Sequence, residues 1–101
     1  MEVEVRQTER FVRWLADLRD LRARAKVLAR IERLIGGNPG DVKPVGAGVS
    51  ELRINYGPGY RVYYMQRGTA LIILLAGGDK HSQTKDSDEA LLLAANLSEE
   101  T

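Results

Sequence analysis

Seven consecutive apolar residues, Ala70 to Ala76, are the strongest constraint on how this 101-residue chain folds. A strand over this run would be apolar on both of its faces, because neighbouring side chains of a strand point to opposite sides. Such a strand belongs in the middle of a sheet, covered on both sides. The run is far too short to span a bilayer. The sequence therefore predicts a sheet with a buried central strand.

Alternating apolar and polar residues predict the remaining strands of this sheet. Turn residues separate them, with Gly46-Ala47-Gly48 as a tight turn and Tyr56 to Gly59 as a hairpin connection. We expect Gly77 to Lys80 to form a loop after the central strand. The alternating segments are residues 1–6, Val42–Val45, Val49–Asn55 and Tyr60–Gln66.

Helical spacing replaces alternation in two other regions of the chain. Between Thr8 and Ile35 we expect two helices or one bent helix, with Thr8 and Asp20 as caps. A last helix is predicted over about 84–97, with Ala90, Leu91, Ala94 and Leu97 facing inward. The layout of strand, helices, strand meander and short helix indicates an α+β fold, a sheet packed against helices in one domain over residues 1–101.

The composition excludes several classes of site. The chain has no cysteine and one histidine, so a disulfide framework, a cysteine nucleophile and a Cys-ligated metal are excluded, and a His-based metal site is not expected. No carboxylate cluster indicates a metal, and we expect no cofactor. The charged N-terminus lacks the apolar core of a signal peptide, and we expect a cytoplasmic protein without a membrane span.

The formal net charge of +1 conceals an uneven distribution. Residues 1–35 and 36–85 each carry a balance of +3, and residues 86–101 carry −5. Arg53 and Arg61 fall on the polar face of consecutive predicted strands, and Lys80 follows the next strand. Like charges on one sheet face are unfavourable unless an anion binds there. The alternative is that Arg53 pairs with Glu51 or a neighbouring strand.

A face of this kind can support cleavage of RNA. RNA carries its own nucleophile, the 2′-hydroxyl, and guanidinium groups can stabilise the charge on the phosphorane. Glu51 or Lys80 would be the base, and Arg53 and Arg61 the electrostatic stabilisers. Tyr56, Tyr60 or Tyr63 would stack on a base or supply a hydroxyl, although Tyr60 and Tyr64 share the face of Val62 and are also candidates for the core.

Four ordered motifs resemble the RelE/ParE toxin superfamily, and specifically the HigB-like branch of addiction-module killer proteins. The helical half also fits, through Phe11-x-x-Trp14-Leu15-x-x-Leu18 and Arg30-Ile31. The motifs are Gly40-Asp41-Val42-Lys43-Pro44-Val45-Gly46, Gly48-Val49-Ser50-Glu51-Leu52-Arg53-Ile54, Gly57-Pro58-Gly59-Tyr60-Arg61-Val62-Tyr63-Tyr64 and Leu74-Leu75-Ala76-Gly77-Gly78-Asp79-Lys80-x-x-Gln83.

The resemblance implies a RelE-like fold, with a mainly antiparallel sheet of about four to five strands, two N-terminal helices and a short C-terminal helix. It implies a toxin of a type II toxin–antitoxin module that cleaves mRNA on the ribosome without a metal. The implied partner is a cognate antitoxin, usually a helix-turn-helix protein of the HigA kind, with operator DNA bound only through the complex.

Carried over by motif, the functional positions fall on Arg53, Arg61 and Lys80, with Lys43 and Gln83 as weaker candidates. Together with Glu51 we expect these to be catalytic, and Lys43, Tyr63, His81 and Gln83 to contact RNA. The chain departs from better-studied RelE proteins, which have lysines where this chain has Glu51 and Arg53, and a tyrosine near Lys85, Asp86 and Ser87.

Two other functions remain open from the sequence. One is a ParE-type toxin that inhibits gyrase by binding, and the other is a degenerate, non-toxic module that retains antitoxin or operator binding through its basic helices. The acidic C-terminal end would either keep the protein soluble or shield the basic face.

Overall fold

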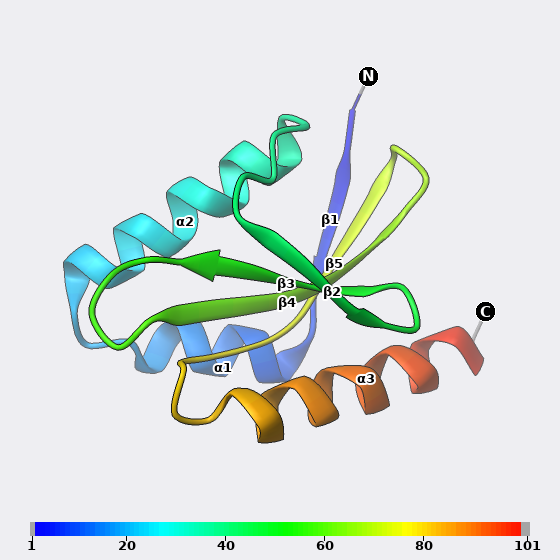
Figure 1. The fold of residues 1–101 in the computed structure, drawn as a ribbon. Coiled ribbons are helices and arrows are strands. Elements are labelled where there is room, and N and C mark those ends of the chain that lie inside the picture. The colour runs from blue at the N-terminus through cyan, green and yellow to red at the C-terminus, as the bar shows by residue number, and fades with distance from the viewer. Residues whose placement is uncertain (1, 100–101) are drawn as a thin grey trace.

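The computed structural model describes residues 2–99 and has an α+β fold (Figure 1). The elements in chain order are β1 (Glu4–Gln7), α1 (Glu9–Asp17), α2 (Leu21–Ile35), β2 (Val42–Gly46), β3 (Val49–Ile54), β4 (Tyr60–Arg67), β5 (Leu71–Gly78) and α3 (Gln83–Glu99). The strands form one sheet in the order β1-β5-β4-β3-β2. Only the β1–β5 pair is parallel. The α+β, RelE-like fold expected from the sequence is confirmed.

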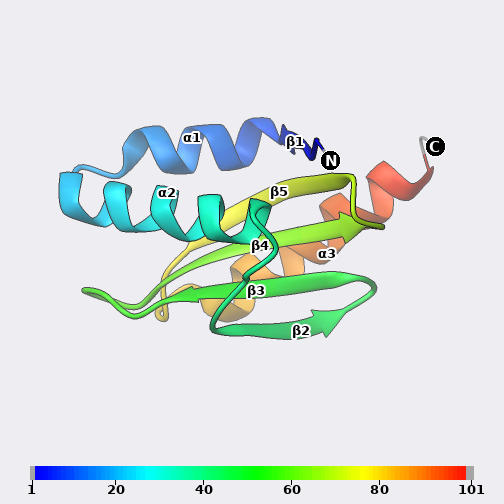
Figure 2. The same ribbon diagram turned by 90° about the horizontal axis from the view of Figure 1, so that it is seen from above.

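Helices cover both faces of this sheet. Helices α1 and α2 lie side by side on one face, and α3 crosses the other (Figure 2). The face toward α1 and α2 buries Phe11, Val27, Leu52, Val62 and Tyr64, among others. The opposite core joins β3, β4 and β5 to the small inner residues of α3. The inward orientation predicted for Ala90, Leu91, Ala94 and Leu97 is confirmed.

The apolar run indeed forms the covered strand. Strand β5 lies between β1 and β4, and all residues from Ile72 to Gly78 are buried. Its bounds are shifted by one or two residues from the prediction. Among residues 2–99, no helix combines the length and the apolar character that crossing a membrane requires.

The region between Thr8 and Ile35 forms two helices and not one bent helix, and each helix has its own N-terminal cap. The Thr8 hydroxyl accepts from the Phe11 N–H at 3.1 Å and donates to the Leu75 carbonyl at 2.6 Å, so it fixes α1 against β5. The Asp20 carboxylate accepts from Arg22 N–H at 3.0 Å and Ala23 N–H at 3.2 Å. The chain therefore begins a separate helix, α2, directly after Asp20.

The prediction of a loop at Gly77 and Gly78 is wrong, since both residues belong to β5. They are glycines because other groups occupy the space of a side chain. A Cβ on Gly77 would lie 2.1 Å from the Trp14 ring, and one on Gly78 would lie 1.7 Å from the Asp86 carboxylate. The glycine pair thus serves close packing of α1 and α3 on the strand.

We predict that Gly77→Ala lowers the free energy of unfolding by about 3 kcal/mol, because the new methyl group overlaps the Trp14 indole. Urea unfolding would measure this. Gly36→Ala is the matched control, since its φ is −75° and its nearest contacts would be 3.5 Å away. Equal stability of the two variants would contradict the packing role of Gly77.

Candidate functional site

Arg53 on β3 and Arg61 on β4 are direct cross-strand partners. Their side chains therefore share one face of the sheet, as the sequence predicts. Glu51 lies on the same face of β3 and accepts a hydrogen bond from Arg61 Nε. Its carboxylate is also 3.6 Å from Arg53 Nε. The anion that offsets the two arginines is thus Glu51 of this chain, in agreement with the alternative that Arg53 pairs with Glu51. The two arginines therefore do not by themselves require an external anion.

The Glu51 carboxylate is the centre of a buried polar cluster. Glu51 is 1% exposed, and Gln83 Nε2 donates to its two oxygens at 3.1 and 3.3 Å. Arg61 also donates to the Gly59 carbonyl at 2.6 Å, and its side chain is 12% exposed. Since Gln83 begins α3, Glu51 joins β3, β4 and α3 at one point.

Lys80 reaches the same end of the sheet from β5. Arg61 pairs with Gly78, two residues before Lys80. The position of a Cβ on Gly59 is 3.2 Å from Arg61 Nη1 and 3.5 Å from Lys80 Cβ, so both side chains meet at Gly59. Lys80 is exposed, in contrast to Arg61. The structure therefore brings the three predicted basic residues together around the β3–β4 turn.

The residues expected to contact RNA divide into exposed and enclosed ones. Lys43 is the cross-strand partner of Glu51 on β2 and is exposed. His81 is exposed in the loop before α3, where its backbone N–H donates to Asp79 Oδ1 at 2.8 Å. Gln83 is engaged with Glu51. Tyr63 lies between the sheet and α3 and is fully buried.

The Tyr63 hydroxyl donates to the Gln83 carbonyl at 3.3 Å. Burial, followed by the nearby Glu51 carboxylate, raises the pKa of Tyr63 above its usual range. Its ring is enclosed, so it cannot stack on a base while α3 is in place. Tyr60 and Tyr64 pack in the core toward α1 and α2, as their shared face with Val62 predicts.

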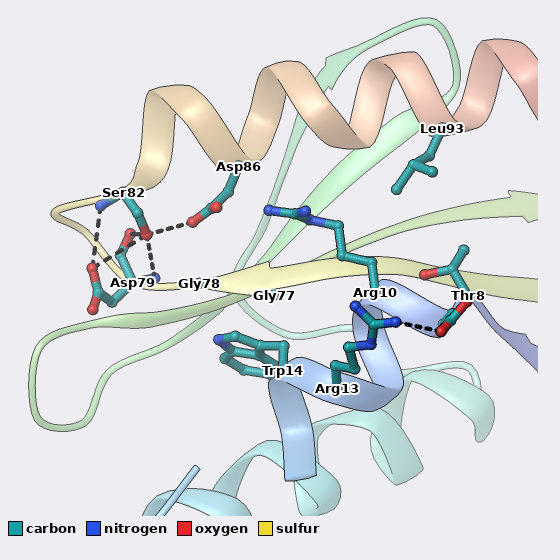
Figure 3. Close-up of a pocket in the computed structure, with 11 residues that line it drawn as sticks. Thr8, Arg10, Arg13, Trp14, Gly77, Gly78, Asp79, Ser82, Asp86 and Leu93 are labelled. Carbon is teal, nitrogen blue, oxygen red and sulfur yellow. Dashed lines mark hydrogen bonds and ion pairs between the residues drawn. The ribbon is translucent and has the colours of Figure 1, made fainter. Parts of the chain in front are cut away.

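A separate cleft lies between α1, the end of β5 and α3 (Figure 3). It has a volume of about 620 Å³, and Trp14 and the two glycines of β5 form part of its wall. Its two arginines are already paired, Arg10 with Glu89 and Arg13 with Glu9. The charged residues that line it are Arg10, Arg13, Glu9, Asp79 and Asp86, which leaves a net charge of −1. This cleft does not favour a phosphate.

Sequence reasoning missed this cleft, although the Gly77-Gly78 pair was a signal that large groups approach the strand. Ser82 donates to the Asp86 carboxylate and accepts from the Asp79 N–H at 3.2 Å, so the polar groups on that side satisfy one another. Within residues 2–99, no three histidine, aspartate or glutamate side chains gather as a possible metal site. The better candidate is the basic cluster of Arg53, Arg61 and Lys80.

This cluster can bind an anion from one side. Arg53, with a side chain 34% exposed, and Lys80 offer accessible positive charge, and Arg61 is held rigidly beside them by Glu51. Guanidinium groups donate several hydrogen bonds in a fixed plane and suit phosphate oxygens. The arrangement fits electrostatic stabilisation of a phosphoryl group.

Residues 13–99 of the chain match the model of a family described as phage-derived protein Gp49-like. Over 97 residues the chain is 50% identical to an uncharacterized protein of Haemophilus influenzae, a match that covers 96% of this chain and 98% of the relative. The family match includes every candidate residue from Lys43 to Gln83.

We predict that Glu51→Gln costs about 3 kcal/mol of unfolding free energy, because it leaves the enclosed Arg61 without its counter-ion. Chemical denaturation would measure the loss. Glu9→Gln is the matched control, since the Glu9–Arg13 pair has side chains 79% and 74% exposed and its loss should cost at most about 0.5 kcal/mol. Similar small effects for both variants would show that Glu51 does not hold the cluster.

Alkaline pH should reveal the buried Tyr63. The unfolded chain releases the tyrosine proton near pH 10 and the folded chain retains it, so Tyr63 stabilises the fold fully below about pH 10 and loses that contribution above it. Between pH 10 and 12, we expect the stability of the parent to fall more steeply than that of Tyr63→Phe, by up to about 1.4 kcal/mol per pH unit. Equal slopes in denaturation measured across this range would contradict the assignment.

Proposed function

We propose that this chain, which belongs to the Gp49-like family of phage-derived proteins, is a toxin that cleaves mRNA. The family is a RelE/HigB-like toxin family of toxin–antitoxin systems, and membership implies an antitoxin partner. We further propose that the chain is a HigB-like toxin of a type II module, that it acts in the cytoplasm and that its activity depends on the ribosome.

One observation supports cleavage above all, namely the cross-strand pair of Arg53 and Arg61 with Lys80 beside it. Arg53 and Arg61 lie near the ends of β3 and β4 that meet at the turn, Lys80 follows β5 by two residues, and a buried carboxylate fixes Arg61. Preorganised donors of this kind stabilise charge that develops in a transition state without reorganisation. A toxin that acts only by binding has no need of this arrangement, which favours cleavage over gyrase inhibition.

In the proposed reaction the 2′-oxygen of RNA attacks the adjacent phosphorus. The O2′–P bond forms, the P–O5′ bond breaks, and the products are a 2′,3′-cyclic phosphate and a 5′-hydroxyl. Arg53 and Arg61 would stabilise the negative charge on the phosphorane oxygens. A base removes the 2′-proton, and an acid protonates the leaving 5′-oxygen.

Glu51 and Lys80 differ in their ability to transfer these protons. The Glu51 carboxylate is enclosed and already accepts from Arg61 and Gln83, so we assign it to positioning Arg61. Lys80 is exposed at the edge of the cluster and remains the candidate for proton transfer. Of the other predicted contacts, Lys43 and His81 are accessible to RNA, whereas Gln83 and Tyr63 hold α3 on the sheet.

The partners follow from the same proposal. We expect an antitoxin of the helix-turn-helix, HigA-like kind, and operator DNA bound only through the toxin–antitoxin complex. The substrate is mRNA on the ribosome.

We predict that Arg53→Gln reduces cleavage by about 10²–10³-fold, the effect of removing one donor to a developing oxyanion. Lys80→Gln should reduce it by about 10²–10⁴-fold, the effect of losing a group that transfers a proton. These side chains are more exposed than Arg61, so their loss should spare the fold. Induced expression followed by primer extension on cellular mRNA would detect new, translation-dependent 5′ ends. Lys85→Gln is the control, an exposed lysine on α3 outside the cluster.

The parent and the control should arrest growth and produce new 5′ ends, whereas the two cluster variants should do neither. Growth arrest by the parent without new 5′ ends would overturn cleavage in favour of a binding toxin. A parent that does not arrest growth would indicate a degenerate module.

A further inference from the structure

A second group of cations lies on the opposite face of the sheet, at the side of α2. Lys26, Arg30 and Arg33 recur at helical spacing and line a pocket of about 270 Å³. Its other walls are Ala29, Ile54 and Asn55, so no acidic side chain lines it. Lys26 Nζ also lies 5.2 Å from the centre of the Tyr56 ring, beside this pocket.

Among residues 2–99, Arg30 forms no ion pair with a carboxylate. Its guanidinium donates to three backbone carbonyls, those of Arg53, Pro39 and Asp41, and its Nε is buried without a hydrogen-bond partner. Arg33 comes close to it, since Nη2 of each residue lies 3.0–3.4 Å from the position of a Cβ on Gly40. In the part of the chain that the structure describes, none of the three pocket cations forms an ion pair.

Burial and the neighbouring Arg33 lower the pKa of Arg30, and Asp41 partly opposes them. Like charges held together in this way repel one another, and an anion in the pocket would relieve the repulsion. The arginines supply planar donors, and Asn55 adds an amide at the end of β3.

We infer that Lys26, Arg30, Arg33 and Asn55 bind a phosphate of the RNA backbone outside the cleavage site, an inference that rests on the proposed function. The pocket is small for a nucleotide but large enough for one phosphate group. Arg30 binds the carbonyl of Arg53, whose side chain belongs to the basic cluster, so both sites lie at the same end of β3. RNA leaving the cluster past the β3–β4 turn would meet the pocket.

An acidic peptide is a less suitable occupant. Peptide helices and strands usually anchor on apolar surface, and the apolar wall here consists of Ala29 and the buried Ile54. A nucleic-acid backbone requires only charge and donors.

The test measures binding of a labelled single-stranded 2′-O-methyl RNA, which lacks the nucleophilic hydroxyl, by fluorescence anisotropy over a series of KCl concentrations. The pocket variant is Lys26→Gln with Arg33→Gln. Its control, Arg19→Gln with Arg22→Gln, removes the same charge from exposed positions outside the pocket. We expect the pocket variant alone to bind about 5-fold more weakly at 0.1 M salt, with a salt slope lower by about 0.7, the value for one phosphate contact on a single strand.

Thermal unfolding should show the pocket variant to be about as stable as the parent, because the loss of Arg33 relieves its repulsion with Arg30 and the loss of Lys26 removes a contact with the Tyr56 ring. Equal losses of affinity in both double variants, no loss in either, or no binding by the parent would overturn the inference. The inference would also be overturned if the pocket variant lost affinity for the antitoxin but bound RNA as tightly as the parent. Because this RNA cannot be cleaved, weak binding confined to the pocket variant would support the site even if the cellular assay showed no mRNA cleavage.

Discussion

The geometry of the basic cluster depends on one buried carboxylate, that of Glu51. A charge removed from water is strongly unfavourable unless it is paired and hydrogen-bonded. Arg61 and Gln83 satisfy this requirement, the first from β4 and the second from the start of α3. The strand that carries Arg53, its neighbour and the covering helix are therefore held in one relative position.

Helix α3 is attached to the sheet in different ways at its two ends. Its first turns bind through polar groups, with Gln83 on Glu51 and Asp86 above Gly78. Its later turns pack small side chains, Ala90 and Ala94, against the sheet. The polar end fixes direction and register, because hydrogen bonds require defined geometry, and the apolar end contributes burial.

Period-two alternation predicted correctly that Arg53 and Arg61 share a face, since that is a local property of paired strands. It did not predict that Glu51 is buried, because burial there depends on α3, a distant segment of the chain. The prediction of a loop at Gly77 failed for the same reason, because a glycine is needed there to make room for the Trp14 ring, which comes from a distant segment. The spacing of Lys26, Arg30 and Arg33 was visible in the sequence, but the pocket also needs Ile54 and Asn55 from β3.

The structure also gives a physical meaning to the acidic C-terminal segment. Within the described residues, Glu89 pairs with Arg10 of α1 and Asp86 accepts from Ser82, so these acids face the cleft at α1. Arg53 and Arg61 are offset by Glu51 instead. Although α3 covers this face of the sheet, Asp86 and Glu89 therefore do not neutralise the cluster. One carboxylate offsets two arginines, so these residues, together with Lys80 and the cations of the pocket on α2, keep a net positive field at one end of the sheet, where it can attract a polyanion.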